Sequence, residues 1–469
     1  FLSLPIVGVD IRIKDKGKFG DDLRLMWYFI FGKDPNLINT EINQYMAVTQ
    51  DDIIRVAESV LGDKQVRLKV FPDAELKQNI SSVDRSVTPD TKGTPEFVPP
   101  TPTRYKLSNG MGLTIIEKSG LPIVSFAIVL RNGSISDPEH FPGLSSFTAQ
   151  MLSEGTEQRT SLEIADAFEY IGTRLSTETR RESTVFSTET LTKHWPEALA
   201  LVSDVLRNPT FPENELTRVK REHLIDLQRA KDDPTFIAEQ NINALMFGGT
   251  TGYGHPAHGT ESSVESFTRS DLLNHYQSLY GPDISELIVV GDIVSSEVLS
   301  LSEEIFSGWD GSEVSPNVLP LTRFDQIDRS TTIYLIDKPG AAQSVIRAGH
   351  TCVPRNHEDY YTLQILNFIF GGQFSARLNQ NLRQDKGYSY GFNSSITWYA
   401  ERSMIVAGGS VQTEVTKESV REVLTEFDEV RRSRPVTTEE LVSSQEGLLK
   451  GYPSGFERPG QILGKLIQL

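Results

Sequence analysis

Histidine spacing is the first pattern to consider, because a metal-dependent hydrolase commonly places two histidines four positions apart on a helix, with a glutamate beside them. None of the eight histidines in this chain of 469 residues follows that spacing. His194 and Glu197 come nearest, but Ala198 stands where the second histidine is required. His255 and His258 lie in a glycine-rich loop, which favours a structural role. The sequence therefore offers no zinc site that is complete in itself.

Other catalytic and binding patterns are also missing from the sequence. There is neither the G-x-S-x-G turn of serine hydrolases nor a glycine-rich phosphate loop. The single cysteine, Cys352, stands in an apolar stretch, which favours a core residue over a nucleophile. With 46 basic and 63 acidic residues the formal charge is −17, which argues against nucleic-acid binding. No apolar run approaches the roughly 20 residues of a membrane span, so none is predicted.

Two breaks in apolar periodicity divide the chain. Prolines interrupt the pattern between residues 74 and 103, and Gly311, Pro316 and Pro320 interrupt it again later, so both stretches favour extended linkers. The predicted organisation is a domain tail over 1–73, a linker over 74–103, a domain over 104–309, a linker over 310–323 and a domain over 324–469.

An internal repeat relates residues 48–73 to residues 267–292 without gaps. In each copy a threonine followed three residues later by aspartate resembles a capping box, a glycine ends the helix, and a β-branched run predicts a strand. Each copy thus predicts the closing helix and strand of a domain. No third copy follows Gln461, so we expect the last domain to be truncated and residues 1–73 to be the tail of an earlier domain.

Strands predicted in blocks, with helices after them, favour an α+β fold over a doubly wound sheet. In the first large domain a helix is expected to start at a capping box formed by Thr160 and Glu163, and alternation over 174–191 predicts a sheet with one wet face. In the second, the predicted elements are strands near 332–336, 344–348, 388–398 and 403–409, and helices near 360–370 and after Thr437.

Several segments resemble the insulinase/pitrilysin family of zinc metallopeptidases. The most specific is the long stretch from Phe370 to Gly391. The others are Leu107–Thr114, Arg131–Pro138, Gly143–Thr156 and Gly291–Asp292. The resemblance runs through essentially the whole chain and is greatest to the C-terminal, non-zinc module of bacterial members with two modules. It implies repeated insulinase-type domains, each an antiparallel-rich sheet packed with a layer of helices.

The zinc motif of the family, H-x-x-E-H, is degenerate in this chain. The matching helix carries Ser146 for the first histidine, Ala149 for the glutamate and Gln150 for the second histidine. The region expected to supply a further glutamate reads Leu224–Gln228 and contains none. A hydroxyl, a methyl and an amide cannot hold zinc against water. We therefore expect zinc in the full assembly but not in this segment.

The resemblance assigns the family's Arg/Tyr pair to Arg383 and Tyr390. Lys386 and Gly387 are expected to turn the chain between a helix end and a strand, so that both side chains converge. A guanidinium and a phenol can donate to a substrate carbonyl and stabilise an oxyanion. The alternative is a surface arginine and an ordinary sheet residue.

Three further residues are candidates for substrate binding. Tyr388 is an alternative to Tyr390. Gly371 and Gly372 predict close backbone packing or a loop near the substrate, with a simple helix C-cap as the alternative.

Together these features predict the non-zinc half of a zinc-dependent endopeptidase. The expected partners are a peptide or unfolded polypeptide, bound by strand addition to a sheet edge, and a zinc-bearing module in the same longer chain or in a partner subunit. The second hypothesis is a proteolytically inactive scaffold of the same fold. By analogy with two-module relatives we expect an extracytoplasmic, periplasmic location, with cytoplasmic or mitochondrial as alternatives.

Overall fold

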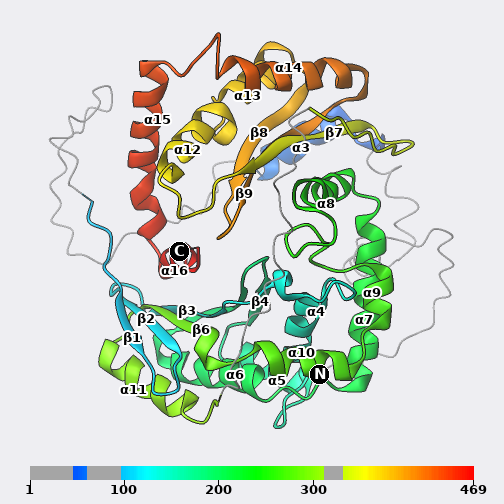
Figure 1. Cartoon of the computed structure of the whole chain (residues 1–469). Helices are drawn as coiled ribbons and strands as arrows, with labels where there is room; N and C mark the ends of the chain where they lie inside the picture. The colour runs from blue at the N-terminus through cyan, green and yellow to red at the C-terminus, as the bar shows by residue number, and fades with distance from the viewer. Residues whose placement is uncertain (1–45, 61–96, 311–330, 469) are drawn as a thin grey trace, which may run out of the picture. The chain divides into compact units, whose positions relative to one another are not determined.

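The computed structural model describes residues 46–60, 97–310 and 331–468 (Figure 1). The chain divides into two compact units, residues 1–93 and 94–469. Within the first unit the described residues are 46–60, and they contain α3 (Gln50–Val60), whose start is capped by reciprocal hydrogen bonds between Thr49 and Asp52. The helix predicted in the first copy of the repeat is thereby confirmed. The strand predicted after it lies outside the described residues.

In the second unit, the first lobe (residues 97–310) is built on a six-stranded sheet in the order β1-β2-β6-β3-β5-β4. Neighbouring strands are antiparallel except β2 and β6, which are parallel. Alternate residues of β3 face opposite sides: Phe126 and Ile128 join the main core, and Ala127 joins a second cluster. The strands are β1 (Thr103–Lys106), β2 (Gly112–Glu117), β3 (Ile123–Leu130), β4 (Ser176–Thr179), β5 (Thr184–Leu191) and β6 (Ser285–Gly291).

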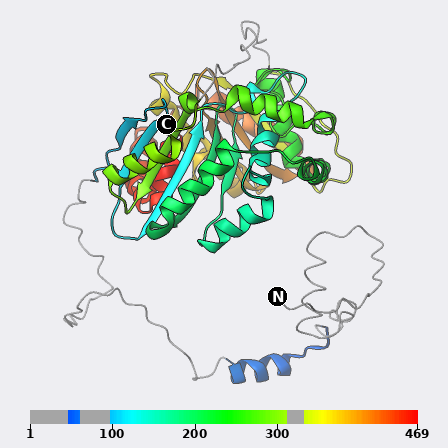
Figure 2. The same cartoon turned by 90° about the horizontal axis from the view of Figure 1, so that it is seen from below.

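Helices cover one face of this sheet and form the main core with it (Figure 2). The predicted capping box is confirmed, since Thr160 and Glu163 exchange hydrogen bonds at the start of α5. The helices are α4 (Leu144–Met151), α5 (Ser161–Tyr170), α6 (Trp195–Arg207), α7 (Glu213–Ala230), α8 (Pro234–Phe247), α9 (Glu261–Ser266), α10 (Arg269–Leu279) and α11 (Ser295–Phe306).

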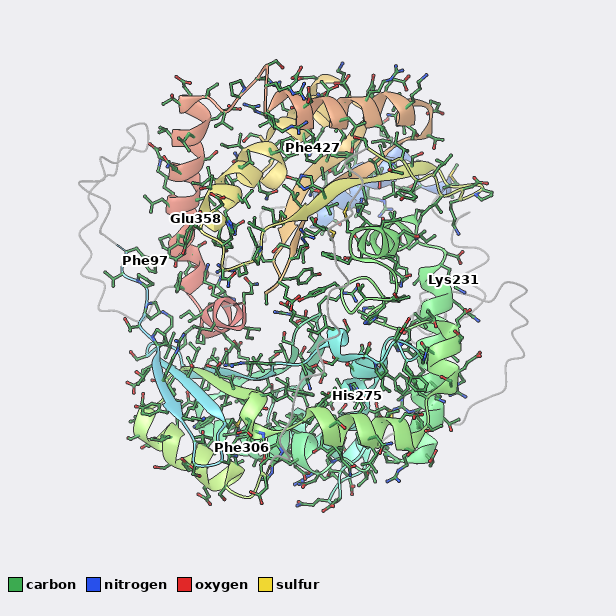
Figure 3. The ribbon with its side chains drawn as sticks, viewed as in Figure 1. Phe97, Lys231, His275, Phe306, Glu358 and Phe427 are labelled. Carbon is green, nitrogen blue, oxygen red and sulfur yellow. The ribbon has the colours of Figure 1, made fainter. Side chains whose placement is uncertain are left out.

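The second lobe (residues 331–468) contains a three-stranded antiparallel sheet in the order β7-β9-β8. Its core joins the sheet to the helices, and Phe427, labelled in Figure 3, packs against Phe370 with ring centroids 4.7 Å apart. The expected α+β fold is confirmed. The elements are β7 (Gln343–Cys352), α12 (Tyr360–Asn367), α13 (Arg377–Asn379), β8 (Ser389–Thr397), β9 (Ser403–Gln412), α14 (Thr416–Glu429), α15 (Thr438–Gly451) and α16 (Pro459–Ile467).

The strand predicted near Thr332–Ile336 is wrong. These residues belong to no ladder and to no helix, and Leu335 is 90% exposed. The physical reason is the lack of a neighbour: a strand needs backbone partners, and within the described residues β7 pairs only with β9. An apolar alternating sequence is therefore not sufficient for a strand here.

Each lobe contributes a helix to the sheet of the other. Ile462 and Leu463 of α16 pack on the first sheet, on the face opposite the main core. In return α8 lies against β7, and Glu239 of α8 contacts Arg347 at 3.1 Å. No helix in the described part of the chain is both long and apolar enough to span a bilayer.

Candidate functional site

The degenerate zinc helix is α4, and its three matched positions differ in exposure. Ser146 is half-buried, Ala149 is buried and Gln150 is exposed. Leu144, Phe147 and neighbouring apolar residues bury the inner face of the helix in the main core. The helix therefore keeps its packing while its outer positions carry no metal-binding group.

The residues around α4 do not fit zinc. A serine hydroxyl, an alanine methyl and a glutamine amide provide neither imidazole nor carboxylate. The acidic residue of the Leu224–Gln228 stretch on α7 is Asp226, and its Oδ1 lies 3.5 Å from Nη1 of Arg229. Nowhere in residues 46–60, 97–310 or 331–468 do three or more His, Cys, Asp or Glu side chains gather as a metal site would require. We therefore assign no metal-dependent step to this chain.

A buried polar cluster anchors the start of α4. The Asp137 carboxylate accepts hydrogen bonds from the backbone N–H groups of Gly143 and Ser145, both at 2.7 Å. Ser145 Oγ lies 3.0 Å from Nε2 of His275, which is labelled in Figure 3. Burial raises the pKa of Asp137 to about 7, although the hydrogen bonds that its carboxylate accepts act to lower it. Burial lowers the pKa of His275 to about 4. His275 is therefore neutral at pH 7, and the cluster is structural.

The histidines of the glycine-rich loop also have structural contacts. Nε2 of the buried His255 lies 2.7 Å from the Ser134 carbonyl oxygen. The carbonyl oxygen of His258 lies 2.7 Å from Nε2 of His223 on α7. These contacts tie the loop to its surroundings, as the sequence indicated.

Arg383 and Tyr390 converge in the second lobe. Arg383 lies in a π-helical segment, Gln380–Asp385, and Tyr390 follows the turn at the start of β8. The guanidinium carbon of Arg383 lies 4.8 Å from the ring centroid of Tyr390 and 4.5 Å from that of Phe374. The guanidinium is thus held between two aromatic rings, an arrangement typical of arginine.

The polar groups of this pair remain open to solvent. Tyr390 is 87% exposed and Phe374 is 64% exposed, whereas Arg383 is half-buried. Within the described residues the Arg383 side chain contacts the rings of Phe374 and Tyr390, and no ion pair or hydrogen bond uses its N–H groups. The site can therefore offer guanidinium donors and a phenol to an incoming acceptor.

Phe374 was not identified from the sequence. An aromatic residue nine positions before an arginine matches no regular helix or strand spacing. Phe374 and Arg383 come together only because the chain turns at Gln373 and continues through the short helix α13. A search for arginines flanked by aromatic residues within one helical hairpin could have found it.

Tyr388 takes a different position from Tyr390. Its side chain is half-buried against the second-lobe core. Its backbone N–H donates to the Leu382 carbonyl at 2.9 Å, and its carbonyl accepts from Gln412 at 3.1 Å. Tyr388 thus fixes the turn that brings Tyr390 to Arg383.

Gly371 and Gly372 lie in a second π-helical segment, Phe368–Gly372, that packs on β8. A Cβ on Gly371 would lie 2.4 Å from the backbone nitrogen of Ser394, closer than real contacts allow. A Cβ on Gly372 would lie 3.0 Å from the side chain and carbonyl of Asn367. Neither glycine is left-handed, so close packing accounts for Gly371 better than a left-handed C-cap does.

Comparison with known proteins accounts for this arrangement. Residues 113–257 match the family described as "Insulinase (Peptidase family M16)", and residues 266–448 match the one described as "Peptidase M16 inactive domain". The two ranges together cover more than half of the chain. The chain belongs to the M16, or insulinase, family. The second M16 match includes Arg383 and Tyr390, and the first includes the degenerate α4.

Curated M16-like relatives carry the name zinc protease. "Uncharacterized zinc protease YmxG" of Bacillus subtilis is 27% identical over 347 residues, which cover 73% of this chain and 81% of the relative. An "Uncharacterized zinc protease" of Rickettsia felis is 24% identical over 348 residues, with the same coverage of 73% and 81%. The family expectation from the sequence is thereby confirmed.

Solved structures share the fold. The peptidase M16 inactive domain from Pseudomonas fluorescens gives a TM-score of 0.67 at 22% identity, covering 78% of this chain and 86% of that one. A protease from Helicobacter pylori gives a TM-score of 0.70 at 15% identity, covering 79% and 89%. At these identities the likeness concerns the M16 fold alone.

Proposed function

We propose that this chain is the non-zinc half of an M16 endopeptidase and that it encloses and positions peptide substrates. Cleavage takes place at a zinc site in another module, either in the same longer chain or in a partner subunit. The observation that carries the proposal is the Arg383 guanidinium, held between Phe374 and Tyr390 with its N–H groups unused by the described residues.

The chemistry assigned to Arg383 and Tyr390 is carbonyl recognition. The guanidinium of Arg383 and the phenol O–H of Tyr390 donate to the oxygen of the scissile amide. Both donors favour the negative charge that develops there during hydrolysis, and removing one such donor typically raises the barrier by about 2.7 to 4 kcal/mol. The aromatic rings fix the guanidinium before substrate arrives, so little reorganisation is needed when it binds.

The absence of metal-binding groups on α4 limits what this chain does by itself. Because Ser146, Ala149 and Gln150 cannot hold zinc, this chain contributes only substrate binding and orientation. The segment alone is proposed to be inactive. We further propose that the peptide binds as a strand added to a sheet edge, and that the assembly works outside the cytoplasm, which fractionation of cells would test.

The test is turnover of the complete assembly after substitution of Arg383. Arg383→Ala should lower kcat by roughly 10² to 10³ while the fold stays intact. Arg421→Ala, an exposed arginine on α14, serves as the control and should leave kcat unchanged. If Arg383→Ala turns over at the rate of the control, Arg383 has no role in the reaction.

A second candidate function is a structural scaffold without proteolysis. The altered α4 favours it, because a scaffold has no need of zinc ligands. The name "inactive domain" of the second family match is also compatible with it. Intact mass and zinc content of the native protein discriminate: a zinc-containing species of about twice this length supports the peptidase, and a stable zinc-free chain of this size supports the scaffold.

A further inference from the structure

The strand β8 carries one residue more than its partner, β9, near the point where it begins. Tyr390 and Gly391 of β8 together stand opposite the single residue Ser410 of β9. The regular pairs on either side are Ser389 with Val411 and Phe392 with Gly409. Two residues opposite one form a β-bulge, which bends a strand and can redirect a side chain.

This bulge decides which way Tyr390 points. Side chains alternate between the two faces of a strand, and beyond the bulge Phe392 and Ser394 are both buried. Counted back from them, regular alternation would bury Tyr390 as well. With the extra residue in place Ser389 is buried instead, and the centroid of the exposed Tyr390 ring lies 4.8 Å from the guanidinium carbon of Arg383. The bulge therefore aims Tyr390 at Arg383.

The buried Ser389 hydroxyl closes the bulge. Its Oγ accepts a hydrogen bond from the Gly391 backbone N–H at 3.1 Å and lies 2.7 Å from the carbonyl oxygens of both Gly391 and Ser410. On β9, Gly409 leaves room for the bulge, because a Cβ there would lie 2.6 Å from the Gly391 carbonyl oxygen. Both features fix the residue that directly follows Tyr390.

A buried asparagine joins the two chain segments that hold Arg383. Asn379 ends the short helix α13, which lies against β8 (Figure 1). Its Nδ2 donates to the Phe374 carbonyl at 2.6 Å, and its Oδ1 accepts from the Phe392 backbone N–H at 3.2 Å. Phe374 supplies one ring beside Arg383, and Phe392 follows the bulge that carries Tyr390. One amide thus fixes the backbone on both sides of the guanidinium.

The Asn379 amide is well suited to hold this geometry. An apolar side chain of the same shape would leave the Phe392 N–H and the Phe374 carbonyl without a partner, so the two segments would move apart to reach water. A displacement of about 1 Å at a group that orients a substrate can lower the rate about 10²-fold. A residue that never touches the substrate can therefore control turnover.

We infer that Asn379 and Ser389 are positioning residues for the Arg383 and Tyr390 pair. Asn379 sets the separation of the Phe374 and Tyr390 rings, and Ser389 holds the bulge that turns Tyr390 towards Arg383. Both side chains are buried, so they act through the rings and not on the substrate. The inference rests on the proposed function, in which Arg383 and Tyr390 bind the carbonyl of the scissile amide.

The first test reads the geometry by NMR in the full chain alone, without turnover. Aromatic rings shift the signals of nuclei above their faces upfield, and Arg383→Lys identifies the Arg383 signals in arginine-labelled protein. In Asn379→Leu this upfield shift should fall by more than about half, because a cation beyond roughly 6 Å from a ring centroid has left the contact. Asn393→Leu, which replaces an exposed asparagine of β8, is the matched control and should leave the shift unchanged.

The second test is kinetic and uses the complete assembly. Asn379→Leu should lower kcat by about 10- to 10²-fold and change KM by less than about twofold, whereas Asn393→Leu should change neither. In a chain that already carries Arg383→Ala and Tyr390→Phe, Asn379→Leu should lower the residual kcat by less than about twofold, because residues that act as one unit are not additive. An asparagine needed only for folding would lower kcat equally in both backgrounds.

Three results decide the inference. Unchanged Arg383 signals in Asn379→Leu, or equal effects on kcat in the two backgrounds, overturn it. If Asn379→Leu does not fold, Ser389→Ala is the smaller change and takes its place under the same expectations. The proposed function fails separately: an unchanged kcat in Arg383→Ala refutes that function, while the NMR shift still decides whether Asn379 and Ser389 hold the rings.

Discussion

Gly371→Ala should destabilise the second lobe through one well-defined clash. The added methyl would lie 2.4 Å from the Ser394 backbone nitrogen and 2.5 Å from its Oγ. Relieving overpacking of this kind typically costs about 1 to 3 kcal/mol. The Ser394 hydroxyl, which donates to Asn367 at 2.8 Å, would also be displaced, which adds about 1 kcal/mol. The expected loss in the free energy of unfolding is therefore about 2 to 4 kcal/mol.

Urea unfolding monitored by hydrogen exchange of β8 and β9 amides measures this loss. Gly391→Ala is the matched control, because no heavy atom lies within 4 Å of its added Cβ, and it should change the stability by less than about 0.5 kcal/mol. Gly372→Ala should lie between the two, since its contacts begin at 3.0 Å. Equal stabilities for the Gly371 and Gly391 variants would refute the idea that close packing at Gly371 sets the distance between the π-helical segment and the strand that carries Tyr390.

Three other substitutions have expected outcomes. Glu440→Gln should lower the free energy of unfolding by about 3 kcal/mol at pH 7, because it leaves buried Arg377 without its bidentate partner. The pKa of Glu440 is lowered to about 2, chiefly by Arg377. The difference in unfolding free energy between the unmodified protein and Glu440→Gln, measured by urea titration, should therefore shrink as the pH falls from about 4.5 towards 2. A difference that stays constant would contradict this. Between about pH 6.5 and pH 4 the free energy of unfolding of the unmodified protein should fall by about 3 kcal/mol more than that of His275→Gln, because the buried imidazole resists the proton that the unfolded chain accepts. Parallel pH profiles of the two proteins would exclude this. Phe374→Ala should reduce kcat of the assembly about two- to fivefold by removing one cation–π contact from Arg383, whereas an unchanged kcat would show that the ring does not position it.

Much of the fold could be predicted because its signals are local. The Thr160 capping box, the repeat that gives α3 and α10 equal lengths, and the alternation before Leu191 each depend on neighbouring residues and are confirmed. The convergence of Arg383 and Tyr390 was also predictable, since one short turn joins their elements. These are cases in which sequence distance and spatial distance nearly coincide.

The remaining features depend on contacts between distant residues. Strand formation at 332–336 needs a partner that local alternation cannot supply, so the prediction there was wrong. Phe374 meets Arg383 only after the intervening chain has folded back. The cluster of Asp137, Ser145 and His275 joins residues up to 138 positions apart, and no spacing rule identifies it. Such sites follow from tertiary packing.

Reconstitution of peptide hydrolysis from separate halves tests the division of labour most directly. This chain, purified in the presence of zinc, should hydrolyse no polypeptide on its own, and the zinc-bearing module alone should be nearly inactive. Mixing the two should restore turnover, and mixing with the Arg383→Ala chain should not. Hydrolysis by this chain alone, or full activity of the zinc-bearing module without it, would contradict the account.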